Sequence, residues 1–111
     1  MQTSTNSTPL YLNRYLFTDV YPFEVVRVIS EKTVEIREMN ATIDPEWKRD
    51  FVPGGFFGHT KNNESQRYLF SRNVEAPILR ARLTKSGVWS VQGEARYVAS
   101  DSPRRFNDFN F

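Results

Sequence analysis

Alternation of apolar and polar residues is clearest over residues 78–84. In an extended strand the apolar positions of this stretch fall on one face, and Arg80 and Arg82 fall on the other. A polar turn containing a glycine follows, and two further stretches, 88–91 and 95–99, have the composition of short strands. This part of the chain therefore predicts an antiparallel meander.

The first half contains a second strand signal. Residues 23–29 are rich in β-branched side chains and follow Pro22, and residues 33–38 alternate after a short polar turn, so the two stretches predict a β-hairpin. Residues 67–71 have the composition of another strand. Residues 10–17 fit either a short strand or a single helical turn, because periodicity does not separate the two over eight positions.

Residues 40–65 interrupt this rhythm. They begin with Asp44, which precedes a proline and suits a helix start or a turn, and they contain the aromatic and glycine-rich stretch 51–59. An insertion of this length in a small domain is usually functional or disordered, and its aromatic content favours order. We expect a mostly β fold, a small antiparallel barrel or strongly twisted meander sheet with one long aromatic and glycine-rich loop.

The 111-residue length allows one domain, for which we expect residues 10–111, with residues 1–9 as a flexible polar tail. The C-terminus carries phenylalanine at positions 106, 109 and 111, and a loose tail would expose all three. We therefore expect this terminus to dock on the body of the domain.

Composition excludes several kinds of chemistry. The chain has no cysteine, which rules out disulfides, cysteine-based zinc sites and thiol nucleophiles. It shows neither a secretory signal nor an apolar run long enough to span a membrane, so we expect no membrane contact, and the absence of cysteine fits a reducing cytoplasm. The net charge is only +2, but most of the basic residues are arginine, which suits anionic ligands and protein interfaces.

Catalytic signals are weak. His59 is the single histidine, no nucleophile-elbow motif is present, and the carboxylates have no spacing typical of a catalytic pair. Residues 54–58 resemble a phosphate loop superficially, but they lack the flanking strand and helix and the Lys-Ser/Thr pair. They fit a sharp turn with a buried aromatic, or a loop whose amides face an anion while an aromatic stacks on a base. We expect no enzymatic activity, metal or cofactor.

Binding is the remaining class of function. Arg80 and Arg82, with Arg67 on a strand that could be adjacent, could form a basic sheet face, either to bind an anion or simply to be solvated. Aromatic residues interleave with these cations and could stack on bases: Tyr68, Trp89, Tyr97 and Phe106. The ligand-binding residues we expect are Trp47, Phe56, Phe57, His59, Arg80 and Arg82.

Four stretches carry a resemblance to known proteins. They are Thr18-Asp19 with residues 21–28, residues 54–59, residues 85–89 and residues 108–111. Over residues 18–111 the chain resembles a group of short, uncharacterised β-rich proteins carried by bacteriophages and related mobile elements. The resemblance implies a phage context, and thus the cytoplasm of a bacterial host, without implying a mechanism.

The leading hypothesis is a phage-type accessory protein that is not an enzyme. It would bind and block a host protein, for instance a defence factor, or sequester an anionic nucleotide. The alternatives are a single-stranded nucleic-acid-binding module for phage replication, a small hydrolase or phosphodiesterase that uses His59, and a minor component of the virion. A homo-oligomer is an additional expectation, because a small β domain has edge strands to protect.

Overall fold

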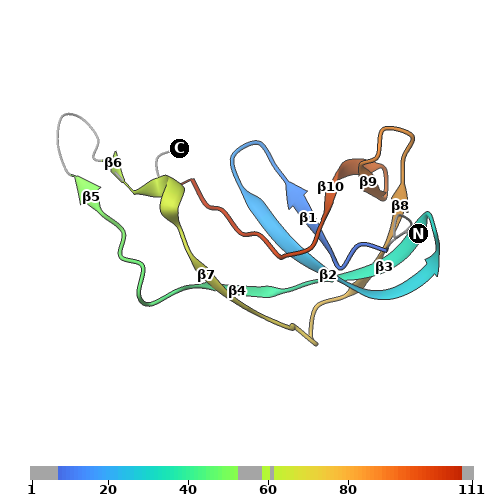
Figure 1. The fold of residues 1–111 in the computed structure, drawn as a ribbon, viewed down its shortest axis with the longest axis horizontal. Helices are drawn as coiled ribbons and strands as arrows, with labels where there is room; N and C mark the ends of the chain where they lie inside the picture. Colours follow the sequence, from blue (N-terminus) through green and yellow to red (C-terminus); the bar gives the residue numbers. More distant parts are fainter. Residues whose placement is uncertain (1–7, 53–58, 61, 109–111) are drawn as a thin grey trace, which may run out of the picture.

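The computed structural model describes residues 8–52, 59–60 and 62–108. Its main body is a closed antiparallel barrel of six strands, which confirms the expected small barrel (Figure 1). The strands, in order around the barrel, are β1 (Tyr11–Tyr15), β10 (Glu94–Ser100), β9 (Trp89–Val91), β8 (Ile78–Leu83), β3 (Thr33–Glu38) and β2 (Val20–Ser30).

Each barrel strand pairs with the strands before and after it in the barrel sequence, and β10 closes the barrel against β1. The topology is thus an up-and-down meander with one long insertion between β3 and β8. The paired register runs from Thr33 opposite Arg82 to Arg37 opposite Ile78 without a bulge. The two ends of the insertion therefore lie side by side at one end of the barrel.

Alternation along the strands supplies the core. Leu12, Ile36 and Ala81 are fully buried, and each comes from a different strand. The rings of Phe23 and Tyr97 meet edge to face, with centroids 5.3 Å apart. This geometry brings the positive edge of one ring to the negative face of the other, and it joins β2 to β10 across the interior.

Two strand boundaries differ from the sequence prediction. Residues 11–15 form a strand, which removes the helical alternative, and β2 begins at Val20 and so includes Pro22. Proline is tolerated there because its missing N–H lies where the β2–β3 ladder ends. Met39 donates to the Pro22 carbonyl at 3.0 Å, and the chain then leaves the barrel.

The insertion, residues 39–77, forms an arm rather than a single loop. Its root is a two-stranded ribbon, and a shorter pair of strands lies farther out (Figure 1), so the molecule measures 52 × 32 × 26 Å. Asp44 opens a turn and not a helix, because its Oδ1 accepts the Glu46 N–H at 2.9 Å and its carbonyl accepts the Trp47 N–H at 2.8 Å. The elements are β4 (Asn40–Ile43), β5 (Phe51–Val52), β6 (His59–Thr60), a 3₁₀ turn (Asn63–Ser65) and β7 (Tyr68–Ser71).

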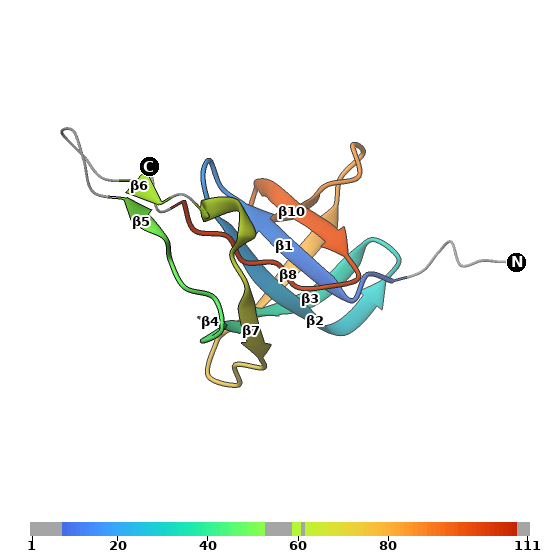
Figure 2. The same ribbon diagram turned by 60° about the vertical axis from the view of Figure 1, so that its left-hand side comes forward.

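The C-terminal segment, residues 101–108, runs back from β10 across the barrel and reaches the arm (Figure 2). Val20 and Phe106 exchange two backbone hydrogen bonds of 3.0 and 3.1 Å, and the Asn107 N–H donates to Oε1 of Gln66 at 3.0 Å. The expected docking of this terminus is confirmed for Phe106. Phe109 and Phe111 lie outside the described residues.

Candidate functional site

The structure places the expected binding residues in different parts of the molecule. Arg80 and Arg82 are exposed on the outer face of β8, as the alternation predicts. Trp47 lies in the arm, where it is 7% exposed and its Nε1 donates to Oγ of Ser65 at 3.2 Å. Trp47 therefore packs within the arm and does not share a surface with the two arginines.

The other three expected residues belong to the outer part of the arm. Phe56 and Phe57 lie outside the described residues. The backbone of His59 pairs with Val52 in the β5–β6 ribbon, and its side chain is not part of the description.

The aromatic and basic side chains do not form the mixed sheet face that a stacking platform needs. Trp89 and Tyr97 are 4% and 3% exposed, so their rings belong to the core. Tyr68 and Arg67 lie in the arm, whose β7 pairs with β4 and not with β8. The suggestion that Arg67 extends the basic face of β8 is therefore wrong, because the insertion carries it away from the barrel.

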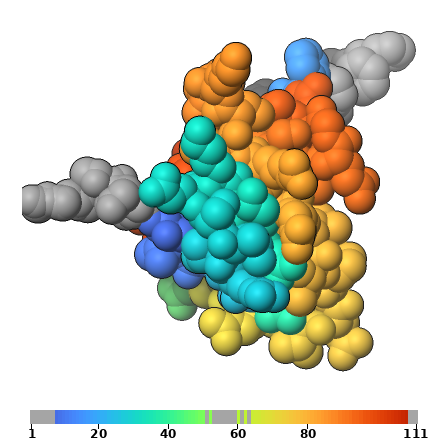
Figure 3. Space-filling view, turned by 90° about the vertical axis from the view of Figure 1, so that its right-hand side faces the viewer, coloured from blue at the N-terminus to red at the C-terminus, as the bar shows by residue number. Residues whose placement is uncertain are grey.

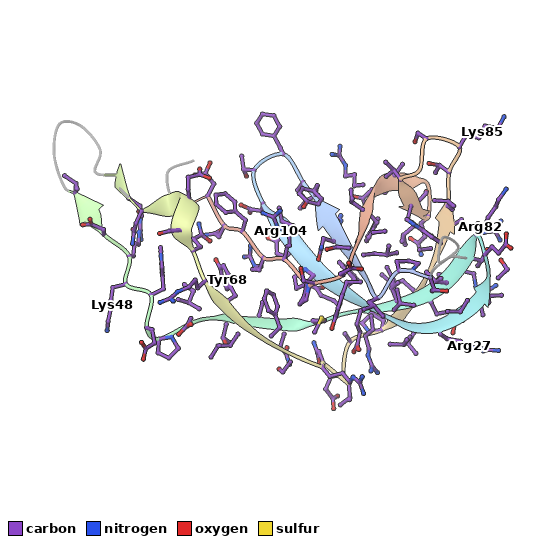
Figure 4. All side chains as sticks on the ribbon, viewed as in Figure 1. Arg27, Lys48, Tyr68, Arg82, Lys85 and Arg104 are labelled. Atoms are coloured by element: carbon purple, nitrogen blue, oxygen red, sulfur yellow. The ribbon has the colours of Figure 1, made fainter. Side chains whose placement is uncertain are left out.

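A basic surface nevertheless exists, at the end of the barrel opposite the arm (Figure 4). It covers the outer face of β2, β3 and β8 and the turns that follow β2 and β8. It contains five exposed cations and two carboxylates. The net charge of this surface, five minus two or +3, exceeds the +2 net charge of the whole chain. We define the basic surface as Arg27, Lys32, Arg80, Arg82 and Lys85, together with Glu31 and Glu35.

Ion pairs neutralise only part of the positive charge of this surface. Glu35 lies between two arginines, 4.0 Å from Arg27 and 3.3 Å from Arg80. No salt bridge involves Arg82 or Lys85 among the residues the structure describes. Charges on an open sheet face are well solvated, so they are free to exchange water for an anionic partner.

Aliphatic side chains adjoin the basic surface. Val28 and Ile29, near the tip of the β2–β3 hairpin, are 50% and 40% exposed. Figure 3 looks onto this end of the barrel, with the blue-green hairpin beside orange β8. The described aromatic residues of these three strands, Tyr21 and Phe23, lie at the opposite end of β2. The surface therefore combines arginine with aliphatic contact area and lacks a described stacking residue.

A pocket of 290 Å³ opens at the other end of the barrel, where the arm begins. We call it the arm-end pocket. Its apolar wall comes from the barrel interior, including Phe23, Leu79 and Val91, and its polar wall includes Arg14, Glu38, Gln92, Glu94 and Tyr97.

Arg14 and Glu94 form a bidentate pair in this pocket. Nε of Arg14 lies 3.1 Å and its Nη2 lies 2.9 Å from Oε2 of Glu94, while the guanidinium carbon is 6.0 Å from the ring centroid of Tyr97. Burial alone lowers the pKa of Arg14, but the hydrogen bond and the charges of Glu94 and Glu38 outweigh it and raise this pKa. Arg14 is thus a permanent cation that one carboxylate already neutralises.

Tyr97 is a buried residue whose side chain lines the pocket. Burial raises its pKa, Arg14 lowers it in part, and Glu94 and Glu38 raise it further, so the phenol stays protonated as a hydrogen-bond donor. Among the described residues its hydroxyl has no hydrogen-bond partner. Glu38, at the pocket rim, has no salt-bridge partner in the described part of the chain.

This pocket has no signal in the sequence. Arg14, Glu38 and Glu94 are far apart in the chain and stand in ordinary strand positions, so no local motif marks them. Only the closure of β1 against β10 brings Arg14 to Glu94. Tyr97 was noted as a stacking residue for an exposed face, whereas the register turns it inward.

The described residues contain no cluster of three histidine, cysteine or carboxylate side chains that could hold a metal ion. Nor do these residues include a helix with the length and apolar character required to cross a bilayer. Comparison of the chain with protein-family models, with curated proteins and with solved structures found no significant match.

Proposed function

We propose that this chain is a binding protein, not an enzyme, and that it docks on an acidic patch of a host protein through the basic surface. The observation that carries the proposal is the surplus of exposed cations at one end of the barrel, next to exposed Val28 and Ile29. Arginine with aliphatic contact area is the composition of a protein interface with a negatively charged partner.

The same composition favours a protein partner over a nucleic acid. Proteins that bind single strands without sequence preference add exposed aromatic rings, on which bases stack, to a basic groove. Trp89 and Tyr97, which the sequence offered for stacking, are buried. The resemblance to short bacteriophage proteins suggests a bacterial protein, for example a defence factor, as the partner that is blocked.

Site-specific photo-crosslinking tests the proposal. A photoreactive residue at Thr33, which pairs with Arg82 in the centre of the basic surface, is compared with one at exposed Thr42 on the arm, in living bacterial cells. We expect a discrete protein adduct from position 33 only. The double variant Arg82→Glu with Lys85→Glu should abolish it by reversing the charge of the surface.

The matched control reverses the same number of charges elsewhere. Lys48 and Arg67 are exposed cations of the arm, so Lys48→Glu with Arg67→Glu should leave the adduct intact. An adduct that nuclease destroys would overturn the proposal in favour of a nucleic-acid-binding module. Equal loss of the adduct in both double variants, or a rise in Tm with nucleotides that disappears with Arg82→Glu, would also overturn it.

A further inference from the structure

The barrel has an unpaired strand edge beside the arm-end pocket. β9 is only three residues long, and its ladder with β8 covers Arg82 and Leu83 alone. After Val91 the chain turns back into β10, so β9 does not reach the first half of β8. Residues 78–81 therefore pair with β3 on one side and with no described strand on the other.

The direction of the free backbone groups follows from two hydrogen bonds. The Leu83 N–H donates toward the β3 side, to Lys32, at 2.8 Å, and the Thr84 N–H donates toward the β9 side, to Val88, at 2.9 Å. Backbone groups of successive residues in a strand point to opposite edges. Because the β8 register has no bulge, the N–H and C=O groups of Ile78 and Arg80 point to the open edge.

We propose that this edge binds an extended peptide segment by β-strand addition, with a lysine side chain of the peptide entering the arm-end pocket. Strand addition takes its affinity from backbone hydrogen bonds and its selectivity from pockets that accept alternate side chains. Here Ile78 and Arg80 supply the backbone groups, and the 290 Å³ pocket lies directly beside them, lined by Leu79 between the two.

The lining of the pocket selects the side chain. A lysine has an apolar stem that can pack on Phe23 and Leu79 and an ammonium group that needs an anion and further acceptors. Glu38 provides a carboxylate without an ion-pair partner among the described residues, and the hydroxyl of Tyr97, which lines the pocket, can accept a hydrogen bond. Arg14 attracts an anionic side chain less than its charge suggests, because Glu94 neutralises it, and Glu38 repels one.

This site is separate from the basic surface of the proposed function. The two sites share Arg80, but the basic surface uses its outward side chain, whereas strand addition uses its backbone groups and the interior pocket. A partner protein could engage either site alone. Arg82→Glu with Lys85→Glu tests the basic surface, and Ile78→Pro and Glu38→Gln test the strand edge and its pocket.

The test adds the capped peptide acetyl-Thr-Val-Lys-Val-Thr-amide to the 111-residue protein and follows the titration by ¹H–¹⁵N NMR. We expect amide shifts at Ile78 and Arg80 and weaker binding when norleucine or glutamate replaces the lysine. Ile78→Pro removes one N–H at the first position of β8, where proline is compatible with a strand, and should weaken binding about tenfold. Ile78→Ala keeps that N–H and should bind within about twofold of the unmodified protein.

A second variant tests the pocket. We expect the unmodified protein to prefer the lysine peptide over the norleucine peptide by only about threefold, because an exposed ion pair contributes little. Glu38→Gln should remove this preference. Shifts that leave Ile78 and Arg80 unaffected, equal binding by both Ile78 variants, or no binding would each overturn the proposal. So would a dimer in sedimentation experiments that Ile78→Pro dissociates, since a second copy would then occupy the edge.

Discussion

The guanidinium carbon of Arg105 lies 4.4 Å from the ring centroid of Tyr21, and on another side it lies 5.7 Å from that of Tyr68. One ring belongs to the barrel and the other to the arm. Nη1 of Arg105 also donates to the Val20 carbonyl at 3.3 Å. Arg105 of the C-terminal segment therefore contacts the arm and the barrel at once.

Replacing this cation should loosen the arm. Arg105→Ala removes two cation–π contacts and the hydrogen bond to Val20, and we expect the free energy of unfolding to fall by about 2 kcal/mol. Urea denaturation measures it. Arg104→Ala is the matched control, because Arg104 is exposed and its bond to Asn13 comes from the backbone N–H, so the change should stay within about 0.5 kcal/mol. Equal losses in the two variants would contradict this role for Arg105.

Glu24 should matter more for stability than Glu35, although each carboxylate faces two arginines. Glu24 is 7% exposed and accepts from Arg37 at 3.5 Å and Arg72 at 3.1 Å. Glu24→Gln leaves the half-buried Arg37 guanidinium without its counter-charge, so we expect a loss of about 2 kcal/mol. Glu35→Gln removes only solvated pairs and should cost below about 1 kcal/mol. Chemical denaturation of both variants side by side measures the difference, and the reverse order would refute the assignment.

The buried phenol of Tyr97 should couple stability to alkaline pH. Burial and the nearby carboxylates raise its pKa in the folded protein above the ordinary tyrosine value. The unfolded chain therefore loses this proton first, so the contribution is fully present below pH 10 and is lost as pH rises through the raised pKa. Tyr97→Phe should lower the slope of unfolding free energy against pH there by at most about 1.4 kcal/mol per unit. Identical slopes in the two proteins would exclude the coupling.

The β9–β10 turn offers a stabilising substitution. Gln92 has φ 51° and Gly93 has φ 86°, which are the angles of a two-residue hairpin turn that favours Asn-Gly. Gln92→Asn should raise stability by about 0.5 kcal/mol. Gly93→Ala should lower it by about 1 kcal/mol through backbone strain alone, since no atom lies within 4 Å of the added Cβ. Thermal unfolding measures both, and a stable Gly93→Ala protein would show that the turn relaxes easily.

The barrel could be predicted because its strands and turns are each marked by neighbouring residues in the sequence. Alternation over residues 78–84 shows which face of β8 enters the core. The turn after β8 contains Gly87, whose φ of 92° is a backbone angle that favours glycine. The hairpin of β2 and β3 has the same kind of signal. Pro22 was read as a boundary because the sequence does not show that the ladder ends beside it.

The basic surface and the arm-end pocket were less predictable because they depend on which distant strands meet. The outward direction of Arg80 and Arg82 follows from alternation, but their grouping with Arg27 and Lys85 requires the order β2–β3–β8. The arm-end pocket depends on closure and on the short length of β9. Neither has a signal in the neighbouring residues.

Arg37 and Ile78 stand opposite each other in the β3–β8 ladder, although the whole arm lies between them in the chain. A hairpin turn of a few residues could therefore join β3 directly to β8 without changing any barrel strand pair. In this respect the barrel is a self-contained scaffold, and the arm is a cassette inserted at one of its hairpins. Grafting a different segment at the same two positions would give a new molecule with an unaltered barrel.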